Sequence, residues 1–545
     1  MNDPQAFYER YRQGSAHWAT YNEQRQAGLI GSNAMPVLGL DETRRYDLAI
    51  PPGGDGSLLG FGGAGCGKSA ALFANNLIRI PGRADTNNIA YLDPRGEHTA
   101  ISMLSATLDL IALYSFNPAG FPWAPQHSTN PLDHLTLDSP SLIADTQKSM
   151  SDLVPIENTR SKWVDEDAQD WSTQMTLGIV ERDGDIDLMR FYRALSSIQG
   201  DLDAWCDLLA CMERSRFDSV RRFSGQIMQL QRVGREGFTA PIGKLQTTFR
   251  FMQDPRIAHA LSGNDFSPKD LCQPGRRVRV GVLVPIEYLG VWGPAIRLLM
   301  GSIIQYKLRN PGGAKVSIYL DEAGQLGSFP SLRELFTFGR GAGLVGNIAA
   351  FQEVSQLYKQ DKHVANEIIG SAQYRMFKSV RTLDSAELLS RMCGSQTLEF
   401  DREINQSDAR RLKQQAAYSL VTGGNFFEAM NDLRHYQKAE RHRTKQSRAL
   451  ARPDEILNMG PTEMVMFASG LVGGPIRGHW RMHFDDPRLA GRYLNNPYHG
   501  DRVHIRTRFG HKKVPVVEAS VPSKYAHLPQ CQSGRIRYPK GFPPR

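Results

Sequence analysis

A run of eight residues, 62–69, has the composition and spacing of a loop that holds phosphate groups. It matches G-x-x-x-x-G-K-[ST] at every fixed position and comprises Gly62, Gly63, Ala64, Gly65, Cys66, Gly67, Lys68 and Ser69. A glycine-rich turn lets backbone N–H groups point at phosphate oxygens, and the helix that follows adds the positive end of its dipole. Lys68 is then placed to reach the β- and γ-phosphates, and Ser69 to ligate Mg²⁺. The run predicts a site for ATP and Mg²⁺.

The same loop also fits a second nucleotide motif, because residues 60–65 match G-x-G-x-x-G. That dinucleotide fingerprint requires an acidic residue roughly 20 positions later, at the end of the next strand. Asp93 ends the next expected strand but lies farther along the chain than this spacing allows. Lys68 and Ser69 have a direct role only in the triphosphate motif, so a triphosphate is the better prediction.

A phosphate-binding loop needs an acidic partner at a strand end to hold Mg²⁺. The mostly apolar run 316–320 predicts a strand, and Asp321 and Glu322 follow it directly. Asp321 is placed to hold the metal together with Ser69. Glu322 is placed to orient and deprotonate an attacking water.

Two further polar residues are candidates for catalysis. Gln352 follows an expected strand over 344–351, where it either senses the γ-phosphate or is an ordinary polar residue at a strand end. Arg340 lies in a glycine-rich stretch before that strand. It is either a surface arginine or an arginine finger that reaches the nucleotide of a neighbouring subunit.

Strands that alternate with helices position these groups and predict an α/β fold with a mainly parallel sheet. We expect helices over 70–78 and 293–308, and strands over 57–61, 88–93, 110–116, 277–284, 316–320 and 344–351. Between 159 and 263 glycines become sparse and apolar residues recur with helical period, which predicts an inserted all-helical domain.

Five segments follow from these patterns. They are an N-terminal extension (1–56), the α/β nucleotide-binding domain (57–158, 264–401 and 453–490), the inserted all-helical domain (159–263), a basic helical excursion (402–452) and a basic, proline-containing tail (491–545) that we expect to be loosely structured.

The composition of the chain indicates which partners and which compartment to expect. The formal net charge of +9 over 545 residues indicates either an anionic partner, such as nucleic acid or a membrane surface, or an inert basic surface. None of the six cysteines forms a C-x-x-C pair, so neither a zinc ribbon nor a disulfide framework is indicated. The sequence shows no long apolar run and no signal-peptide pattern, so we expect a cytoplasmic protein or one peripheral to the inner face of the cell membrane.

With these motifs the sequence resembles the type IV coupling proteins, which are the ring ATPases of conjugation and type IV secretion. Residues 320–327 (LDEAGQLG) resemble the family's L-D-E signature, and residues 339–343 with 352–357 resemble its G-R-x-x-G and Q-x-x-S-Q-L block. Weaker resemblances occur at 93–97 (DPRGE), 130–132 (NPL), 163–171 and 452–456 (RPDEI). Taken together, all of these matches cover roughly residues 57 to 485.

The resemblance implies a RecA-like motor fold related to the FtsK-HerA superfamily, and a homo-hexameric ring with a nucleotide between neighbours. It implies relaxase-bound DNA as cargo and type IV secretion channel components as partners. The family usually begins with a transmembrane hairpin, which this sequence lacks. We therefore expect a separate membrane-anchoring partner or a soluble branch of the family.

Three functions compete on these grounds. The first is a DNA-stimulated ATPase that recruits or pumps DNA for conjugative transfer. The second is a cytosolic FtsK/HerA-like DNA translocase, and the third is a nucleotide-binding adaptor that recruits protein cargo to a secretion system. The set of Lys68, Ser69, Asp321 and Glu322 favours an active enzyme.

Overall fold

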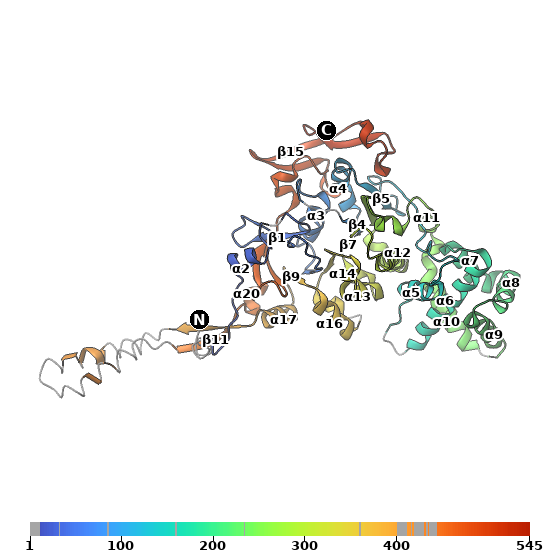
Figure 1. Ribbon diagram of the computed structural model, residues 1–545, viewed down its shortest axis with the longest axis horizontal. Helices are drawn as coiled ribbons and strands as arrows, with labels where there is room; N and C mark the ends of the chain where they lie inside the picture. Colours follow the sequence, from blue (N-terminus) through green and yellow to red (C-terminus); the bar gives the residue numbers. More distant parts are fainter. Residues whose placement is uncertain are drawn as a thin grey trace. The chain divides into compact units, whose positions relative to one another are not determined.

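The computed structural model is shown in Figure 1. It describes residues 11–31, 33–83, 87–157, 161–233, 235–358, 361–400, 411–415, 417–418, 430–431, 434 and 444–544. These described residues divide into two compact units. The smaller comprises the described parts of 1–20, 380–459 and 473–476, and the larger comprises the rest.

The described residues form an 11-stranded sheet in the order β2-β1-β13-β12-β9-β3-β8-β7-β4-β6-β5. Its last seven strands are all parallel: β9 (Tyr374–Lys378), β3 (Leu58–Gly62), β8 (Ile348–Phe351), β7 (Val316–Leu320), β4 (Asn88–Asp93), β6 (Val278–Leu283) and β5 (Ala112–Phe116). Every residue of β3, β4, β6, β7 and β8 is buried, as expected for the apolar strands of a parallel sheet. The predicted α/β fold with a mainly parallel sheet is confirmed.

The other end of the sheet is built from segments far apart in sequence. β12 (Glu463–Ala468) pairs antiparallel with β9. Beyond it lie β13 (Ile476–His479), β1 (Val37–Asp41) and β2 (Asp47–Ala49), with β1 antiparallel to both of its neighbours. The segment that we assigned to an N-terminal extension therefore contributes two strands, because its apolar residues Val37, Leu38 and Leu48 are buried there.

Helices follow the strands in the order that the sequence predicts. The helix after β3 begins as a π-helical turn, η1 (Ser69–Phe73), and continues as α3 (Ala74–Ile78). The next helices that bear on the site are α4 (Glu97–Leu108), α12 (Leu289–Arg309), α13 (Pro330–Thr337), α14 (Gly339–Ala342), α15 (Val354–Tyr358) and α16 (Lys362–Ser371). Within the described part of the chain, none of the helices has both the length and the apolar character needed to cross a bilayer.

Residues 142–260 are almost entirely helical (Figure 1). Their helices are α5 (Leu142–Leu153), α6 (Lys162–Asp183), α7 (Leu188–Gly200), α8 (Leu202–Glu213), α9 (Asp218–Val233), α10 (Arg235–Thr248) and α11 (Pro255–Ala260). Phe191 and Phe249 stack with their ring centroids 4.6 Å apart, and Trp171 contacts Phe223 edge to face. By contrast, Trp163 is 45 % exposed and contributes little to the packing of these helices.

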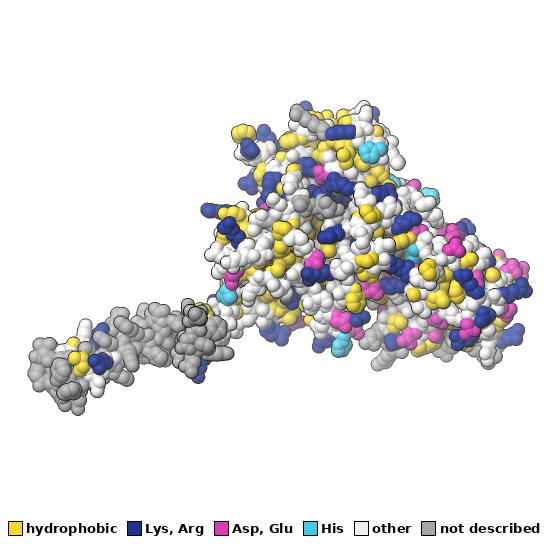
Figure 2. Space-filling view, in the orientation of Figure 1, with side chains coloured by type: hydrophobic (Ala, Val, Ile, Leu, Met, Phe, Trp, Pro, Cys, Tyr) yellow, Lys and Arg dark blue, Asp and Glu magenta, His cyan; other side chains and the backbone are white. Residues whose placement is uncertain are grey.

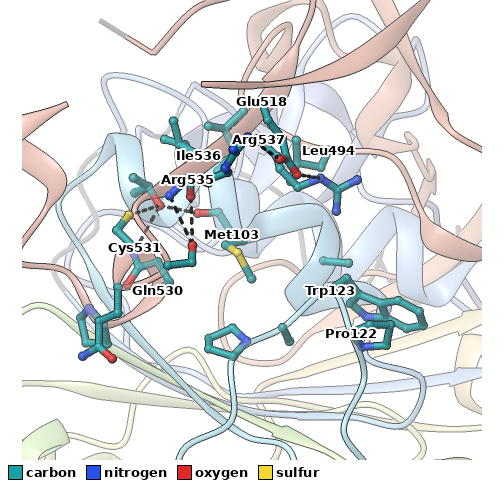
Figure 3. Close-up of a pocket in the computed structure, with 18 of the residues that line it drawn as sticks. Met103, Pro122, Trp123, Leu494, Glu518, Gln530, Cys531, Arg535, Ile536 and Arg537 are labelled. Carbon is teal, nitrogen blue, oxygen red and sulfur yellow. Dashed lines mark hydrogen bonds and ion pairs between the residues drawn. The ribbon is translucent and has the colours of Figure 1, made fainter. Parts of the chain in front are cut away.

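The C-terminal segment is folded, so the expectation of a loosely structured tail is wrong. β14 (Arg502–Thr507), β15 (Gly510–Ser520) and β16 (Arg535–Pro539) form an antiparallel sheet. The sheet buries Val503 and Ile505 against α3, and Ile536 in a cluster with Leu104 of α4. A cavity of about 450 Å³ lies where α4 meets this sheet, with Met103 and Ile536 among its lining residues (Figure 3). The basic and proline-rich composition concealed an alternating strand pattern that one buried face stabilises.

The smaller unit contains α17 (Leu383–Cys393), β10 (Ser395–Phe400), β11 (Thr444–Ala449) and α20 (Pro453–Leu457). β10 and β11 pair antiparallel, with Gln396 opposite Arg448. The predicted helical excursion is therefore wrong over 444–449, because these backbone groups pair with β10. Most of the rest of 402–443 lies outside the described residues.

Candidate nucleotide-binding site

The loop between β3 and η1 has a conformation that only glycine adopts without strain. Gly65 and Gly67 have φ values of +74° and +86°. A Cβ atom at Gly67 would also lie 2.5 Å from Cε of Met482, closer than such atoms approach. Backbone conformation thus explains Gly65 and Gly67, and at Gly67 a side chain would also displace Met482.

Lys68 and Ser69 extend from the start of the helix towards the carboxyl ends of β7 and β8. The Lys68 ammonium donates to the carbonyl of Gly62 at 3.0 Å and lies 3.6 Å from Oε1 of Glu322. The Ser69 hydroxyl donates to Oδ2 of Asp321 at 2.9 Å. The structure therefore brings the two predicted halves of the site together.

Glu322 and Gln352 lie side by side at the ends of β7 and β8. Gln352 donates from Nε2 to Oε2 of Glu322 at 3.0 Å, and its own backbone N–H donates to the side chain of Gln356. Glu322 has a φ of +60°, which is uncommon for a residue other than glycine. Strained backbone of this kind is frequent where a side chain must be aimed at a functional site.

His98 is part of this cluster, and the sequence analysis missed it. Its Nε2 lies 2.9 Å from Oδ2 of Asp321, and both side chains are buried. Burial lowers the pKa of His98, but the charge of Asp93 and the contact with Asp321 outweigh it and raise the pKa to about 9. Burial acts in the opposite sense on Asp321, where the hydrogen bond and charge of His98 prevail and lower the pKa. The DPRGE turn that directly precedes His98 is the signal that would have found it.

The donor set fits a hydrated Mg²⁺ rather than a metal enclosed by protein. Oδ1 of Asp321 is buried and has no hydrogen-bond partner among the described residues, so it has capacity for a further ligand. The described residues contain no group of three or more His, Cys, Asp or Glu side chains arranged to hold a metal. Mg²⁺ is typically bound by one or two carboxylates together with phosphate oxygens and water, which this arrangement can provide.

Arg340 lies apart from this cluster. It belongs to α14, its side chain is 64 % exposed, and its Nε lies 2.6 Å from Oδ2 of Asp55. It does not line the cavity that the described residues form around Lys68.

Cys66 is buried in the phosphate loop, and its carbonyl accepts a hydrogen bond from Lys378.

The cavity around Lys68 has a volume of about 770 Å³, which suits a ligand of nucleotide size. One side is formed by residues of the phosphate loop and by the residues that directly follow β7 and β8. The other side is formed by the C-terminal segment, with Met482, Phe484, Arg502 and His504 among its lining residues. The sequence analysis missed this contribution entirely, since no motif marks these residues.

A family model described as type IV secretory system conjugative DNA transfer matches residues 53–423 of this chain. The conjugal transfer protein TraG of Agrobacterium fabrum is 24% identical over 222 residues, which are 40% of this chain and 29% of that protein. A probable conjugal transfer protein TraG of Sinorhizobium fredii is 24% identical over 229 residues, 41% of this chain and 31% of that protein. The matched part thus spans less than a third of the length of these curated relatives.

Solved structures of similar fold include the bacterial conjugative coupling protein TrwBdeltaN70. It aligns with a TM-score of 0.54 and 17% identity over 87% of this chain and 93% of that chain. The plasmid coupling protein TrwB in complex with ADP and Mg²⁺ aligns with a TM-score of 0.52 and 16% identity, over 87% of this chain and 94% of that one. At this level of identity the likeness shows a common fold.

Proposed function

This chain belongs to the type IV secretory system conjugative DNA transfer family, and we propose that it is an ATP-hydrolysing coupling protein. Its task is to recruit or pump relaxase-bound DNA to a type IV secretion channel. One observation carries the enzymatic part of the proposal: Lys68, Ser69, Asp321, Glu322 and Gln352 converge on a single cavity. An amine, a hydroxyl, two carboxylates and an amide in this arrangement match the needs of phosphoryl transfer to water.

Each group in the cavity has a distinct role in this proposal. Backbone N–H groups of residues 62–67 cradle phosphate oxygens, and Lys68 neutralises the β- and γ-phosphates. Ser69 and Asp321 hold Mg²⁺, which supplies charge stabilisation to the transferring phosphoryl group when it is bound. Glu322 accepts a proton from the attacking water, and Gln352 fixes the Glu322 carboxylate through their hydrogen bond.

The surface of the C-terminal sheet supports an anionic partner. Arg506, Arg508, Lys512 and Lys513 are all exposed on β14 and β15 or in the turn between them. On the face shown in Figure 2, this region carries Lys and Arg with few carboxylates, whereas the helices α6–α10 carry both signs of charge. A surface of one sign favours association with the phosphates of DNA.

We also propose that the protein works as a homo-hexamer at the inner face of the cell membrane. In this proposal it binds components of the secretion channel and a separate membrane-anchoring partner. The position of Arg340 supports the ring, because this exposed arginine lies outside its own subunit's cavity. A heterologous contact that closes into a ring would bring it to the next subunit's nucleotide.

Arg340→Ala is expected to lower ATP turnover by about 10³-fold or more, the magnitude of losing an arginine finger. When the variant is mixed in equal amounts with the Glu322→Gln variant, activity should rise above that of either variant alone, because a site with an intact Glu322 can then receive Arg340 from the neighbouring subunit. Steady-state ATPase assays of the mixtures measure this. Arg333→Ala removes an exposed arginine of α13 that pairs with Glu367, and it serves as the matched control. No recovery of activity in the mixture of Arg340→Ala with Glu322→Gln would contradict action in trans.

DNA is expected to accelerate ATP hydrolysis by the full-length protein. The measurement is the ATPase rate with single-stranded and with double-stranded DNA, over a range of salt concentrations. Stimulation should weaken steeply as salt rises, because phosphate contacts release counterions. It should depend little on sequence, since phosphate contacts carry no base information directly. Equal rates with and without DNA would contradict DNA pumping and favour an adaptor for protein cargo.

A further inference from the structure

Two chemically different sets of residues line the cavity around Lys68. The set described above is polar and carries the amine, hydroxyl and carboxylates. A second set is apolar and comprises Ile101, Met482, Phe484 and Leu494. A nucleoside triphosphate has the same division, with an anionic phosphate chain at one end and a flat, weakly polar base at the other.

The segment 482–484 lies directly on the phosphate loop and the helix that follows it. Met482 occupies the space in which a side chain at Gly67 would have to lie. The ring of His483 is buried, and its Nδ1 lies 3.2 Å from the carbonyl oxygen of Ala70 in η1. A nucleoside is bonded to the α-phosphate, so it must leave the phosphate loop within reach of this segment.

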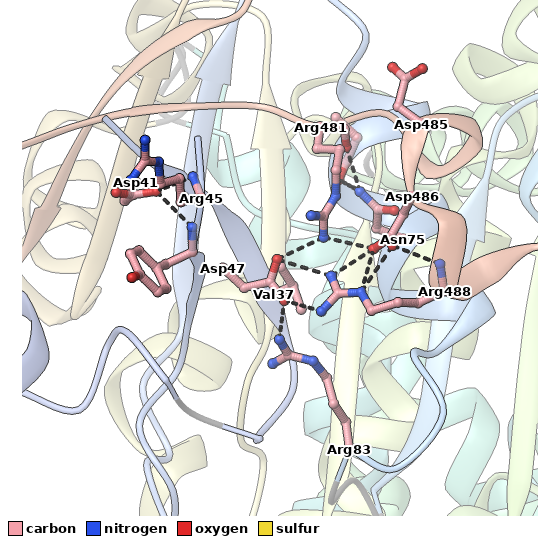
Figure 4. Close-up of polar contacts among 12 residues, drawn as sticks. Val37, Asp41, Arg45, Asp47, Asn75, Arg83, Arg481, Asp485, Asp486 and Arg488 are labelled. Atoms are coloured by element: carbon pink, nitrogen blue, oxygen red, sulfur yellow. Dashed lines mark hydrogen bonds and ion pairs between the residues drawn. The ribbon is translucent and has the colours of Figure 1, made fainter. Parts of the chain in front are cut away.

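Ion pairs to two largely buried carboxylates, Asp47 and Asp486, fix the segment in place (Figure 4). Asp47 of β2 accepts hydrogen bonds from Arg83, Arg481 and Arg488, and the last two also pair with Asp486 at 2.7 Å. Burial alone would raise the pKa of Asp47, but the hydrogen bond from Arg488 and the neighbouring arginine charges lower it to about 2. Arg481 and Asp486 flank Met482–Phe484, so the edge of the main sheet holds both ends of this short stretch.

Strand β14 completes the wall. Val503 and Ile505 point into the core shared with α3, where Tyr493 also packs. Because side chains alternate along a strand, Arg502 and His504 point to the other face, and both line the cavity. Hydrogen-bond donors therefore stand next to the apolar surface of Met482 and Phe484.

We propose that residues 482–504 form the nucleoside-binding half of the nucleotide site. Phe484 and Met482 pack against the base, and Arg502 and His504 donate hydrogen bonds to the ribose and the adjoining phosphate. This inference rests on the proposed function, since it requires that the phosphate loop binds a triphosphate. The segment lies outside residues 53–423, so it is a feature of this chain beyond the part that the family model matches. The site thereby selects nucleoside triphosphates over inorganic polyphosphate.

The test compares the affinity of the full-length protein for ATP and for inorganic tripolyphosphate, both with Mg²⁺, by calorimetry. Phe484→Ala is expected to weaken ATP binding about ten-fold, the lower range for losing an aromatic ring stacked on a base. Its affinity for tripolyphosphate should not change. Phe509→Ala is the matched control, because Phe509 is 92 % exposed in the β14–β15 turn and does not line the cavity. His504→Ala removes an exposed side chain and so tests the same wall without disturbing the core.

The outcomes separate the two proposals. Loss of ATP affinity with retained tripolyphosphate affinity in Phe484→Ala and, to a smaller extent, in His504→Ala supports the subsite. Wild-type ATP affinity in both variants overturns the subsite and leaves the proposed function intact. Equal loss of both ligands also overturns it, since the residues would then act on the phosphate loop alone. A wild-type protein that binds neither ligand overturns the proposed function as well.

Discussion

Lys68→Ala is expected to abolish ATP binding and to reduce hydrolysis to background. The Lys68 ammonium is buried and lies between the Gly62 carbonyl and Glu322, where β- and γ-phosphates would replace both contacts. Hydrogen bonds to a charged group contribute about 1.5–3 kcal/mol each, so losing two of them weakens binding by about 100-fold or more. The carboxylates of Asp321 and Glu322 would then face the phosphates without the charge of Lys68 to balance them. Binding is measured by calorimetry with ATP and Mg²⁺, and turnover by phosphate release.

Lys162→Ala is the control for this prediction. Lys162 lies on α6, is 56 % exposed in its side chain, and pairs only with Glu166 of the next turn among the contacts described. Its removal should leave both binding and turnover unchanged. The thermal midpoint of both variants shows whether they fold. Hydrolysis by Lys68→Ala at the wild-type rate would rule out the proposed mechanism.

The parts of the site that lie within motifs could be predicted from sequence, because a motif indicates both the local backbone conformation and which side chain stands at each position. Ser69 and Asp321 are 252 positions apart, yet they form a hydrogen bond. They meet because the carboxyl ends of parallel strands lie at one edge of a sheet, and their role in holding Mg²⁺ stays a prediction. Gln352 was placed correctly beside Glu322 for the same reason, although its catalytic role stays a prediction.

The remaining parts depend on tertiary contacts that have no local signature. His98 is a histidine on a helix, and only its proximity to Asp321 distinguishes it from a core residue. Val503 and Ile505 alternate with arginine and histidine, and such a short pattern does not reveal which surface the strand will cover. No local sequence pattern marks Asp47 as a residue of an ion-pair cluster. In the structure it accepts hydrogen bonds from Arg83, Arg481 and Arg488, which come from other parts of the chain. The nucleoside end of the cavity was missed because every residue that builds it is positioned by contacts of this kind.

Glu322→Gln is expected to retain ATP binding and to lose hydrolysis by about 10²–10⁴-fold, the usual effect of removing a general base. The substitution keeps the size of the side chain, and the new amide oxygen can still accept the hydrogen bond from Gln352. It removes the carboxylate that would take the proton of the attacking water. It also removes the negative charge 3.6 Å from Lys68, so the ammonium is freer to engage phosphate and ATP affinity should be equal or higher.

Glu353→Gln is the matched control, because Glu353 follows Gln352 directly but does not line the cavity. Both variants are compared by single-turnover hydrolysis and by ATP affinity. A drop in affinity that parallels the drop in rate would mean that Glu322 holds the metal or the loop rather than activating water. Retained affinity with lost turnover would separate Glu322 from Lys68, which in the proposed mechanism contacts the phosphates in the ground state and in the transition state alike. A group that acts only in the transition state, such as one that activates the water, changes the rate and leaves binding intact.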